Sequence, residues 1–237
     1  MSTRSEPGPI ALVGSGEYLE TMADVEASLL AGRARRYVQL ATAAVPDGPD
    51  VVARWHALGR EQAERLDVEQ VVLDVTTRED AEDPAIIARL EGAGLIYLSG
   101  GHPGFLADTL RDSRLWEAIV AAWRNGAALA GCSAGAMALS AWIPSLRHPR
   151  RGTTPGLGLL PHLRVIPHFD AFARRVPDLI TQYLVLHDEQ VSVLGIDEQT
   201  ALIGGPFDWV VRGRGSVWRL SDDGREQFPD GATLATP

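Results

Sequence analysis

Short apolar runs, each closed by glycine or polar residues, recur along the first 135 residues of the chain. The clearest of them cover residues 9–16, 36–42, 69–75, 94–101 and 127–135. Apolar segments of this length that end in turn residues are typical of strands buried on both faces. The pattern therefore predicts buried strands at these places.

Longer stretches with apolar residues at helical spacing separate these runs, at 49–66, 83–94 and 113–126. The second opens on Asp-Pro and the third on Ser113, both of which are helix-entry signals. Strands that alternate with helices imply right-handed crossovers and a mostly parallel sheet. We therefore expect an α/β fold, with its binding site beyond the carboxyl ends of the strands.

The second half of the chain has a less regular pattern. Residues 143–163 are rich in proline and glycine and predict a long loop or a short excursion. Strands are expected at 164–169 and 191–205, with a helix over about 171–186 between them. Two β-rich runs separated by Arg-Gly-Arg-Gly predict a C-terminal hairpin at about 207–220. No linker or repeat divides the sequence, so residues 1–237 are expected to form a single domain.

Composition narrows the class of protein. The chain has 237 residues, of which 45% are hydrophobic, and a formal net charge of −9. An acidic chain has no general attraction to nucleic acid or to anionic membranes. It contains 22 arginines and no lysine, so arginine must supply any cationic side-chain contact to a substrate.

The cysteine content and the lack of an apparent targeting signal bear on the cellular compartment in which the protein is expected. A single cysteine excludes an internal disulfide. The first residues lack the apolar stretch of a signal peptide, and no apolar run is long enough to span a membrane. We expect a soluble cytoplasmic protein with no nucleic-acid or membrane partner, and a homodimer is compatible with the sequence.

The chemistry is concentrated at residues 130–136, Ala-Gly-Cys-Ser-Ala-Gly-Ala, where two potential nucleophiles are adjacent. Gly131 to Gly135 fits the pattern G-x-S-x-G, between a predicted strand and a helix-forming run. In such a nucleophile elbow the central residue is exposed on a tight strand-to-helix turn. That position belongs to Ser133, whereas Cys132 is the last strand residue and is expected to pack inside the protein.

A serine nucleophile needs a base and a group that orients the base. His102 and His168 both follow predicted strands, and position alone does not choose between them. For the acid, Asp197 and Glu198 end another apolar run. Adjacent side chains on extended backbone point to opposite faces, so at most one of these two carboxylates is expected to face the site.

Four segments in this order carry a family resemblance: LSGGHPGFLADTL (98–110), AGCSAGAMAL (130–139), IPHF (166–169) and GIDEQTAL (195–202). The opening segment ALVGSGEYL (11–19) adds a Gly-rich first loop. Together they resemble the peptidase E and cyanophycinase family of serine peptidases. That resemblance implies a three-layer α/β/α sandwich with a mostly parallel central sheet, similar to the class I glutamine amidotransferases.

The resemblance also implies roles for individual residues. Ser133 would be the nucleophile, His168 the general base and Glu198 the acid that orients it. Gly101 and Ala134 would supply the N–H groups of an oxyanion hole. The expected reaction is acyl transfer on a small peptide or related amide, with no metal or cofactor. The elbow is similar to that of the amidotransferases, but serine in place of their central cysteine argues against glutaminase chemistry.

The substrate pocket departs from the family pattern. His102 follows the glycine pair where Asn or Asp is usual, and Phe172 and Pro177 interrupt the expected series of arginines. Arg174 and Arg175 remain, and we expect them, with His102, to bind the substrate, because arginine forks suit a carboxylate. A solvated helix face is an equally good explanation of the two arginines.

This altered pocket leaves several functions open. An aspartyl dipeptide or a β-aspartyl compound is one substrate class. A binding or assembly protein without activity is a second reading, and an esterase or amidase with a non-peptide substrate is a third.

Overall fold

The structure is a computed structural model that describes residues 6–144, 153–173, 191–221 and 224–237. Its centre is an eight-stranded sheet in the order β14-β11-β10-β1-β5-β4-β2-β3. Five neighbouring strands are parallel: β1 (Ile10–Val13), β5 (Ala128–Cys132), β4 (Leu95–Leu98), β2 (Arg36–Leu40) and β3 (Glu69–Val72). Three antiparallel strands extend this sheet: β10 (Thr200–Gly204), β11 (Asp208–Gly213) and β14 (Thr233–Ala235). The predicted mostly parallel sheet is therefore confirmed.

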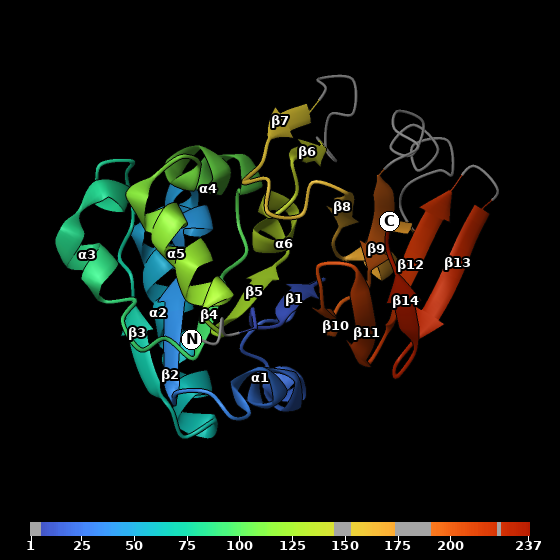
Figure 1. The fold of residues 1–237 in the computed structure, drawn as a ribbon, viewed down its shortest axis with the longest axis horizontal. Coiled ribbons are helices and arrows are strands. Elements are labelled where there is room, and N and C mark those ends of the chain that lie inside the picture. Colours follow the sequence, from blue (N-terminus) through green and yellow to red (C-terminus); the bar gives the residue numbers. More distant parts are fainter. Residues whose placement is uncertain (1–5, 145–152, 174–190, 222–223) are drawn as a thin grey trace, which may run out of the picture.

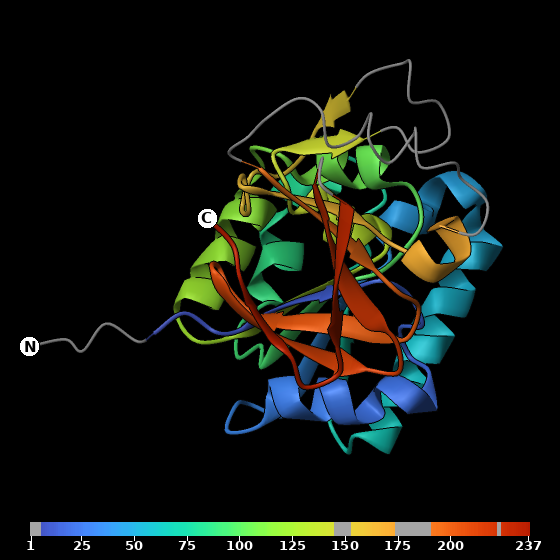
Figure 2. The same ribbon diagram turned by 90° about the vertical axis from the view of Figure 1, so that its right-hand side faces the viewer.

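Helices cover both faces of the sheet, which gives the predicted three layers (Figures 1 and 2). One face carries α1 (Ala23–Leu30) and α2 (Pro49–Arg65), and the other carries α3 (Pro84–Ala88), α4 (Pro103–Leu110), α5 (Arg114–Arg124) and α6 (Ala134–Ala138). Short 3-10 helices lie at Glu20–Met22, Thr42–Asp47 and Asp80–Glu82. No helix among the described residues is long and apolar enough to cross a lipid bilayer.

The strands pack on both faces because successive side chains alternate between them. In β5, Leu129 packs in the cluster on the α4 and α5 side, whereas Ala130 and Cys132 pack on the α1 and α2 side. Strands buried on both faces have no polar side, and this explains why they appear in the sequence as continuous apolar runs.

A second sheet lies beside strands β10 and β11 of the first sheet, at the right of Figure 1. Its order is β13-β12-β9-β8, formed by Gly224–Pro229, Ser216–Ser221, Ser192–Ile196 and Leu163–Ile166. The predicted excursion at 143–163 contributes a small two-stranded sheet, β6 (Trp142–Pro144) with β7 (Thr153–Pro155). Helix α7 (Phe169–Ala173) follows β8, and the rest of the helix predicted over about 171–186 lies outside the described residues.

The hairpin predicted at about 207–220 is wrong in its pairing. Both strands form, but β11 pairs with β10 and β14, whereas β12 pairs with β9 and β13. The chain changes sheets between them: Gly213 has φ +130°, and the N–H of Gly215 donates to Thr200 Oγ1 at 2.9 Å. A glycine-rich connection therefore turns the chain from one sheet to the other instead of reversing it. The assignment of residues 1–237 to one domain stays a prediction.

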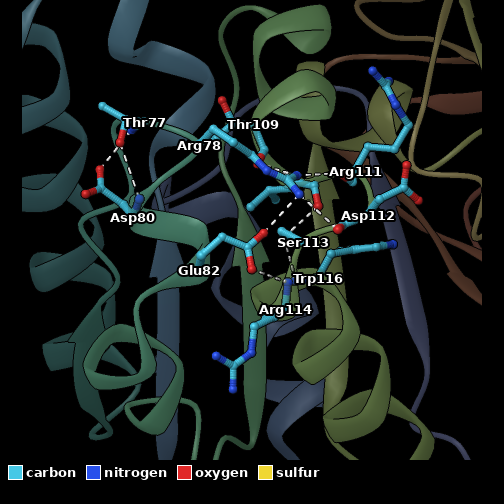
Figure 3. A network of polar contacts seen from close by, with 11 residues as sticks. Thr77, Arg78, Asp80, Glu82, Thr109, Arg111, Asp112, Ser113, Arg114 and Trp116 are labelled. Carbon is cyan, nitrogen blue, oxygen red and sulfur yellow. Dashed lines mark hydrogen bonds and ion pairs between the residues drawn. The ribbon is translucent and has the colours of Figure 1, made fainter.

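The junction between α4 and α5 is held by the guanidinium of Arg78 (Figure 3). It donates to the carbonyls of Thr109 and Arg111 and, at 2.9 Å, to that of Asp112, and it pairs with Glu82 at 2.9 Å. The last carbonyls of a helix lack intrahelical donors, and a cation there also suits the helix dipole. This network fixes the C-terminal end of α4, the helix that begins just after the Gly100–Gly101 pair.

Candidate functional site

Ser133 lies on the predicted strand-to-helix turn. It joins β5 to α6 with φ +49° and ψ −106°, a conformation that non-glycine residues rarely adopt. The flanking glycines make this turn possible. A Cβ on Gly131 would come within 2.6 Å of the carbonyl carbon of Gly135, and one on Gly135 would come within 2.2 Å of the Leu98 oxygen. The elbow geometry expected from the sequence is confirmed.

Cys132 points away from this turn and is fully buried, as predicted. Its thiol donates to Glu17 Oε2 at 2.7 Å. Burial raises the pKa of the Cys132 thiol well above its ordinary value, and the neighbouring Glu17 carboxylate raises that pKa further. Because the thiolate is the nucleophilic form of cysteine, this environment keeps Cys132 unreactive.

The hydroxyl of Ser133 meets an imidazole, and the imidazole meets a carboxylate. Ser133 Oγ lies 3.1 Å from His168 Nε2, and His168 Nδ1 lies 2.8 Å from Glu198 Oε1. His102 is engaged elsewhere, with its Nε2 2.8 Å from Asp47 Oδ1. Of the two candidate histidines, the structure therefore brings His168 to the serine.

The two adjacent carboxylates do point apart, as the alternation of extended backbone predicts. Asp197 is buried and accepts the N–H of Ser216 at 2.9 Å and the indole N–H of Trp218 at 3.0 Å. Burial raises the pKa of Asp197, against the lowering effect of these two hydrogen bonds. Glu198 faces His168 instead, and its own backbone N–H donates to Asp170 Oδ1 at 3.0 Å.

The loop at the end of β1 holds the backbone of the three segments that carry Ser133, His168 and Glu198. The consecutive carbonyls of residues 13, 14 and 15 accept, in that order, the N–H groups of Ser133 at 2.9 Å, His168 at 3.3 Å and Gln199 at 3.0 Å. A Cβ on Gly14 would lie 2.2 Å from the backbone carbonyl oxygen of Asp197, so no side chain fits there. Sequence reasoning identified this loop only as a resemblance and missed its role as a common support.

The same three anchored residues have left-handed backbones, with φ +49° at Ser133, +51° at His168 and +54° at Gln199. Each such conformation costs a non-glycine residue on the order of 1 kcal/mol or more, and it persists only where the surroundings enforce it. Non-glycine residues of this kind cluster at functional sites.

The segments that carry the two expected oxyanion donors both lie next to Ser133. A Cβ on Gly100 would lie 3.5 Å from Ser133 Cβ, so the glycine-pair loop is next to the serine. Gly101 has φ +139°, and within the described residues its N–H donates no hydrogen bond to another protein group. Ala134 is the first residue of α6, where an N–H has no intrahelical acceptor.

Glu17 is the residue that sequence reasoning missed. It lies in the Gly-rich loop after β1, is only 6% exposed, and accepts both the Cys132 thiol and the N–H of Gly100. A carboxylate directly after Gly14-Ser15-Gly16, at the end of a buried strand, is the signal that could have identified it. Arg174 and Arg175 lie outside the described residues.

A hydroxyl, an imidazole and a carboxylate in this order can activate the hydroxyl as a nucleophile, because the imidazole can take its proton and the carboxylate can orient the imidazole. The side chains of His168 and Glu198 are 44% and 42% exposed, so a ligand can reach them. Among the described residues, no group of three or more His, Cys, Asp or Glu side chains is placed to hold a metal ion.

Comparison with known proteins gives consistent matches. The sequence profile of peptidase family S51 matches residues 10–204. The cyanophycinase of Trichormus variabilis is 30% identical over 197 residues, which is 79% of this chain and 64% of that protein. The cyanophycinase of Synechococcus elongatus is 33% identical over 179 residues, 71% of this chain and 54% of that protein. The chain thus spans less than two thirds of the length of these relatives.

A solved structure covers nearly the whole chain. The crystal structure of a peptidase from an acI-B1 Actinobacterium superposes with a TM-score of 0.89 at 39% sequence identity, and the match covers 98% of both chains. The overall fold of this chain is therefore one that has already been observed experimentally.

Proposed function

The chain belongs to peptidase family S51, and from this premise we propose that it is a serine hydrolase that cleaves a small peptide or a related amide through an acyl-enzyme on Ser133. The observation that supports this most strongly is the run of contacts from Ser133 Oγ to His168 at 3.1 Å and from His168 to Glu198 at 2.8 Å. A binding protein that had lost the chemistry would not need to keep the two contacts together.

The proposed reaction begins when Ser133 Oγ attacks the amide carbonyl and its proton passes to His168 Nε2. Glu198 accepts the Nδ1–H of His168, which holds the productive tautomer and stabilises the imidazolium. The tetrahedral intermediate then expels the amine, which takes the proton from His168. Water attacks the resulting ester with His168 again as the base, and the acid product leaves.

The N–H groups of Gly101 and Ala134 are the proposed donors to the negatively charged oxygen of the intermediate. Both are backbone donors. Gly101 has φ +139°, and a Cβ on this residue would lie 2.3 Å from the Ala43 carbonyl oxygen, so only glycine fits there. Preorganised donors of this kind act strongly, since removal of one costs about 100-fold to 1000-fold in kcat in other hydrolases.

The proposed substrate-binding residues are His102, Arg174 and Arg175. The side chain of His102 is 47% exposed and pairs with Asp47, and it follows directly on the glycine pair beside Ser133. Substrates with a carboxylate near the cleaved bond suit the two arginines, because a guanidinium group pairs well with a carboxylate. Aspartyl dipeptides and β-aspartyl dipeptides are therefore the first compounds to test, with simple esters as the comparison.

The decisive experiment is active-site labelling with a fluorophosphonate probe. Wild type should form a covalent adduct, Ser133→Ala should form none, and Cys132→Ala should label like wild type. Absence of labelling in folded wild-type protein would refute the proposal. Adduct formation in folded Ser133→Ala would assign the nucleophile to another residue. A panel of the dipeptides and esters, with Ser133→Ala as the blank, would then define the substrate.

A further inference from the structure

We propose that Glu17 is a positioning residue for the reaction: its carboxylate aligns the Gly100–Gly101 backbone against Ser133, so that the Gly101 N–H meets the developing oxyanion. This inference rests on the proposed function and concerns a side chain that does not touch the substrate. It acts through the main chain of the glycine pair.

The two oxygens of the Glu17 carboxylate have different partners. Oε1 accepts the backbone N–H of Gly100 at 2.8 Å, and Oε2 accepts the thiol of Cys132 at 2.7 Å. These partners are the residues that immediately precede Gly101 and Ser133. One buried carboxylate thus joins the residue before the proposed oxyanion donor to the residue before the proposed nucleophile.

Strand order explains how a single side chain reaches both loops. β5 lies between β1 and β4 in the sheet, and all three run parallel (Figure 1). Glu17 leaves the end of β1 and reaches across the end of β5 to the loop that follows β4. It does so on the α1 and α2 side, where the Cys132 side chain also lies.

The ends of the glycine-pair loop are already fixed by other contacts. Ser99 N–H donates to the Leu40 carbonyl at 3.0 Å, and His102 N–H donates to the Ala43 carbonyl at 2.7 Å. Between them lie two glycines, which have the greatest backbone freedom of any residue. The bond to Glu17 is the contact that orients the peptide plane before Gly100, and hydrogen bonds to carboxylates are among the stronger ones.

Gly100 is closely confined between the carboxylate and the nucleophile. A Cβ on this residue would lie 2.8 Å from Glu17 Oε1 and 3.5 Å from Ser133 Cβ. Movement of the carboxylate would therefore shift the loop relative to Ser133. A displacement of roughly 1 Å at a reacting group can cost about 100-fold in rate, so small shifts here are sufficient to be measured.

A matched pair of variants distinguishes the length of the Glu17 side chain from its negative charge as the property that matters. Glu17→Asp keeps the carboxylate but withdraws it by one methylene group, whereas Glu17→Gln keeps the length and one acceptor oxygen for the Gly100 N–H. The readout is the kinetics of fluorophosphonate labelling. In that step the Ser133 Oγ–P bond forms, the P–F bond breaks, fluoride leaves with the electron pair and the hydroxyl proton passes to His168.

We expect the labelling rate constant of Glu17→Asp to fall about tenfold or more, with the concentration for half-maximal labelling changed less than about twofold, because alignment and not binding is affected. Glu17→Gln should recover most of the wild-type rate. Gly100→Ala should show the same fall in rate constant as Glu17→Asp, because its added Cβ displaces the carboxylate from the opposite side. Thermal unfolding of each variant establishes that it is folded.

Three results would overturn the inference. The first is wild-type labelling in folded Glu17→Asp, and the second is a slow Glu17→Gln beside a fast Glu17→Asp, which would make charge the requirement. The third is wild-type labelling in Gly100→Ala, which decides the matter even if the Glu17 variants fail to fold. If wild type itself does not label, the proposed function fails instead, so the two failures are distinguishable.

Discussion

Ser133 and His168 meet through their side chains at 3.1 Å, and both have left-handed backbones, at φ +49° and +51°. Their N–H groups are bound by the adjacent carbonyls of residues 13 and 14. The hydroxyl and the imidazole are thus held in place by enforced main-chain conformations on both sides of their contact.

The strained backbone of Ser133 leads us to expect a stability difference between two variants that lack its hydroxyl group. Glycine accepts φ +49° with ψ −106° without steric penalty, whereas alanine keeps the Cβ. We expect Ser133→Gly to be more stable than Ser133→Ala by about 1 kcal/mol, after allowance for the greater unfolded-state entropy of glycine. Urea denaturation of the two variants measures this difference, and a less stable Ser133→Gly would show that the turn is not strained.

The two neighbouring carboxylates predict opposite phenotypes. Glu198→Gln should lower kcat/KM by roughly 1000-fold or more, because the amide no longer holds the productive His168 tautomer, and should leave the unfolding free energy nearly unchanged. Asp197→Asn should instead lower the unfolding free energy by about 1–3 kcal/mol, because one of its two buried donors loses an acceptor. Rate measurements and denaturation of both variants test the assignment. Loss of activity in stably folded Asp197→Asn would reverse it.

Glu26 predicts how stability depends on pH. It is buried, Gln62 Nε2 donates to it at 3.0 Å, and burial raises its pKa from 4.5 to about 7. Between these values the folded state binds more protons than the unfolded state, so the unfolding free energy decreases as pH rises through this window. This loss of stability is absent below the pKa that Glu26 has in the unfolded chain and complete above the pKa that it has in the folded protein. Its full size is on the order of 3 kcal/mol.

Glu26→Gln removes this dependence, since the amide stays neutral at every pH. We expect the variant to gain stability relative to wild type as pH rises from about 5 to about 8, with the two nearly equal at the acidic end. Denaturation curves across that range provide the comparison. A constant difference between the two proteins would mean that folding does not raise the pKa of Glu26.

The Gly14 contact predicts a substitution that disturbs the site without touching a reacting group. Gly14→Ala would place a methyl group 2.2 Å from the backbone carbonyl oxygen of Asp197. The loop after β1 and the segment that carries Glu198 must therefore move apart. We expect lower stability, by about 2 kcal/mol or more, and strongly reduced fluorophosphonate labelling. Ser15→Ala is the control, because the carbonyl of residue 15 is kept; wild-type labelling in Gly14→Ala would contradict the supporting role of this loop.

Sequence patterns were informative wherever one local rule decided the outcome. The apolar runs predicted the parallel strands. The G-x-S-x-G spacing predicted the strand-to-helix turn at Ser133, and the place of Cys132 as the last residue of β5 predicted its burial. The choice of Glu198 over Asp197 was beyond local rules. It depends on the register of β9 with β12, which places the Asp197 carboxylate on Ser216 and Trp218.

The errors have a common physical origin in long-range contacts. The Arg-Gly-Arg-Gly segment has the composition of a hairpin turn, yet Thr200 and Gly213 lead the chain into another sheet. The local sequence could have singled out Glu17, but its partners lie 83 and 115 positions away and are not indicated by that segment. Contacts at that distance along the chain are decided by the assembled sheet.

The three backbone carbonyls of residues 13–15 have a consequence for the evolution of this protein. Main-chain hydrogen bonds do not depend on side-chain identity, so substitutions at residues 13 and 15 that preserve the local packing leave the spacing of serine, imidazole and carboxylate intact. Under the proposed function, such a scaffold separates the chemistry from the choice of substrate, so that a new specificity needs few mutational steps.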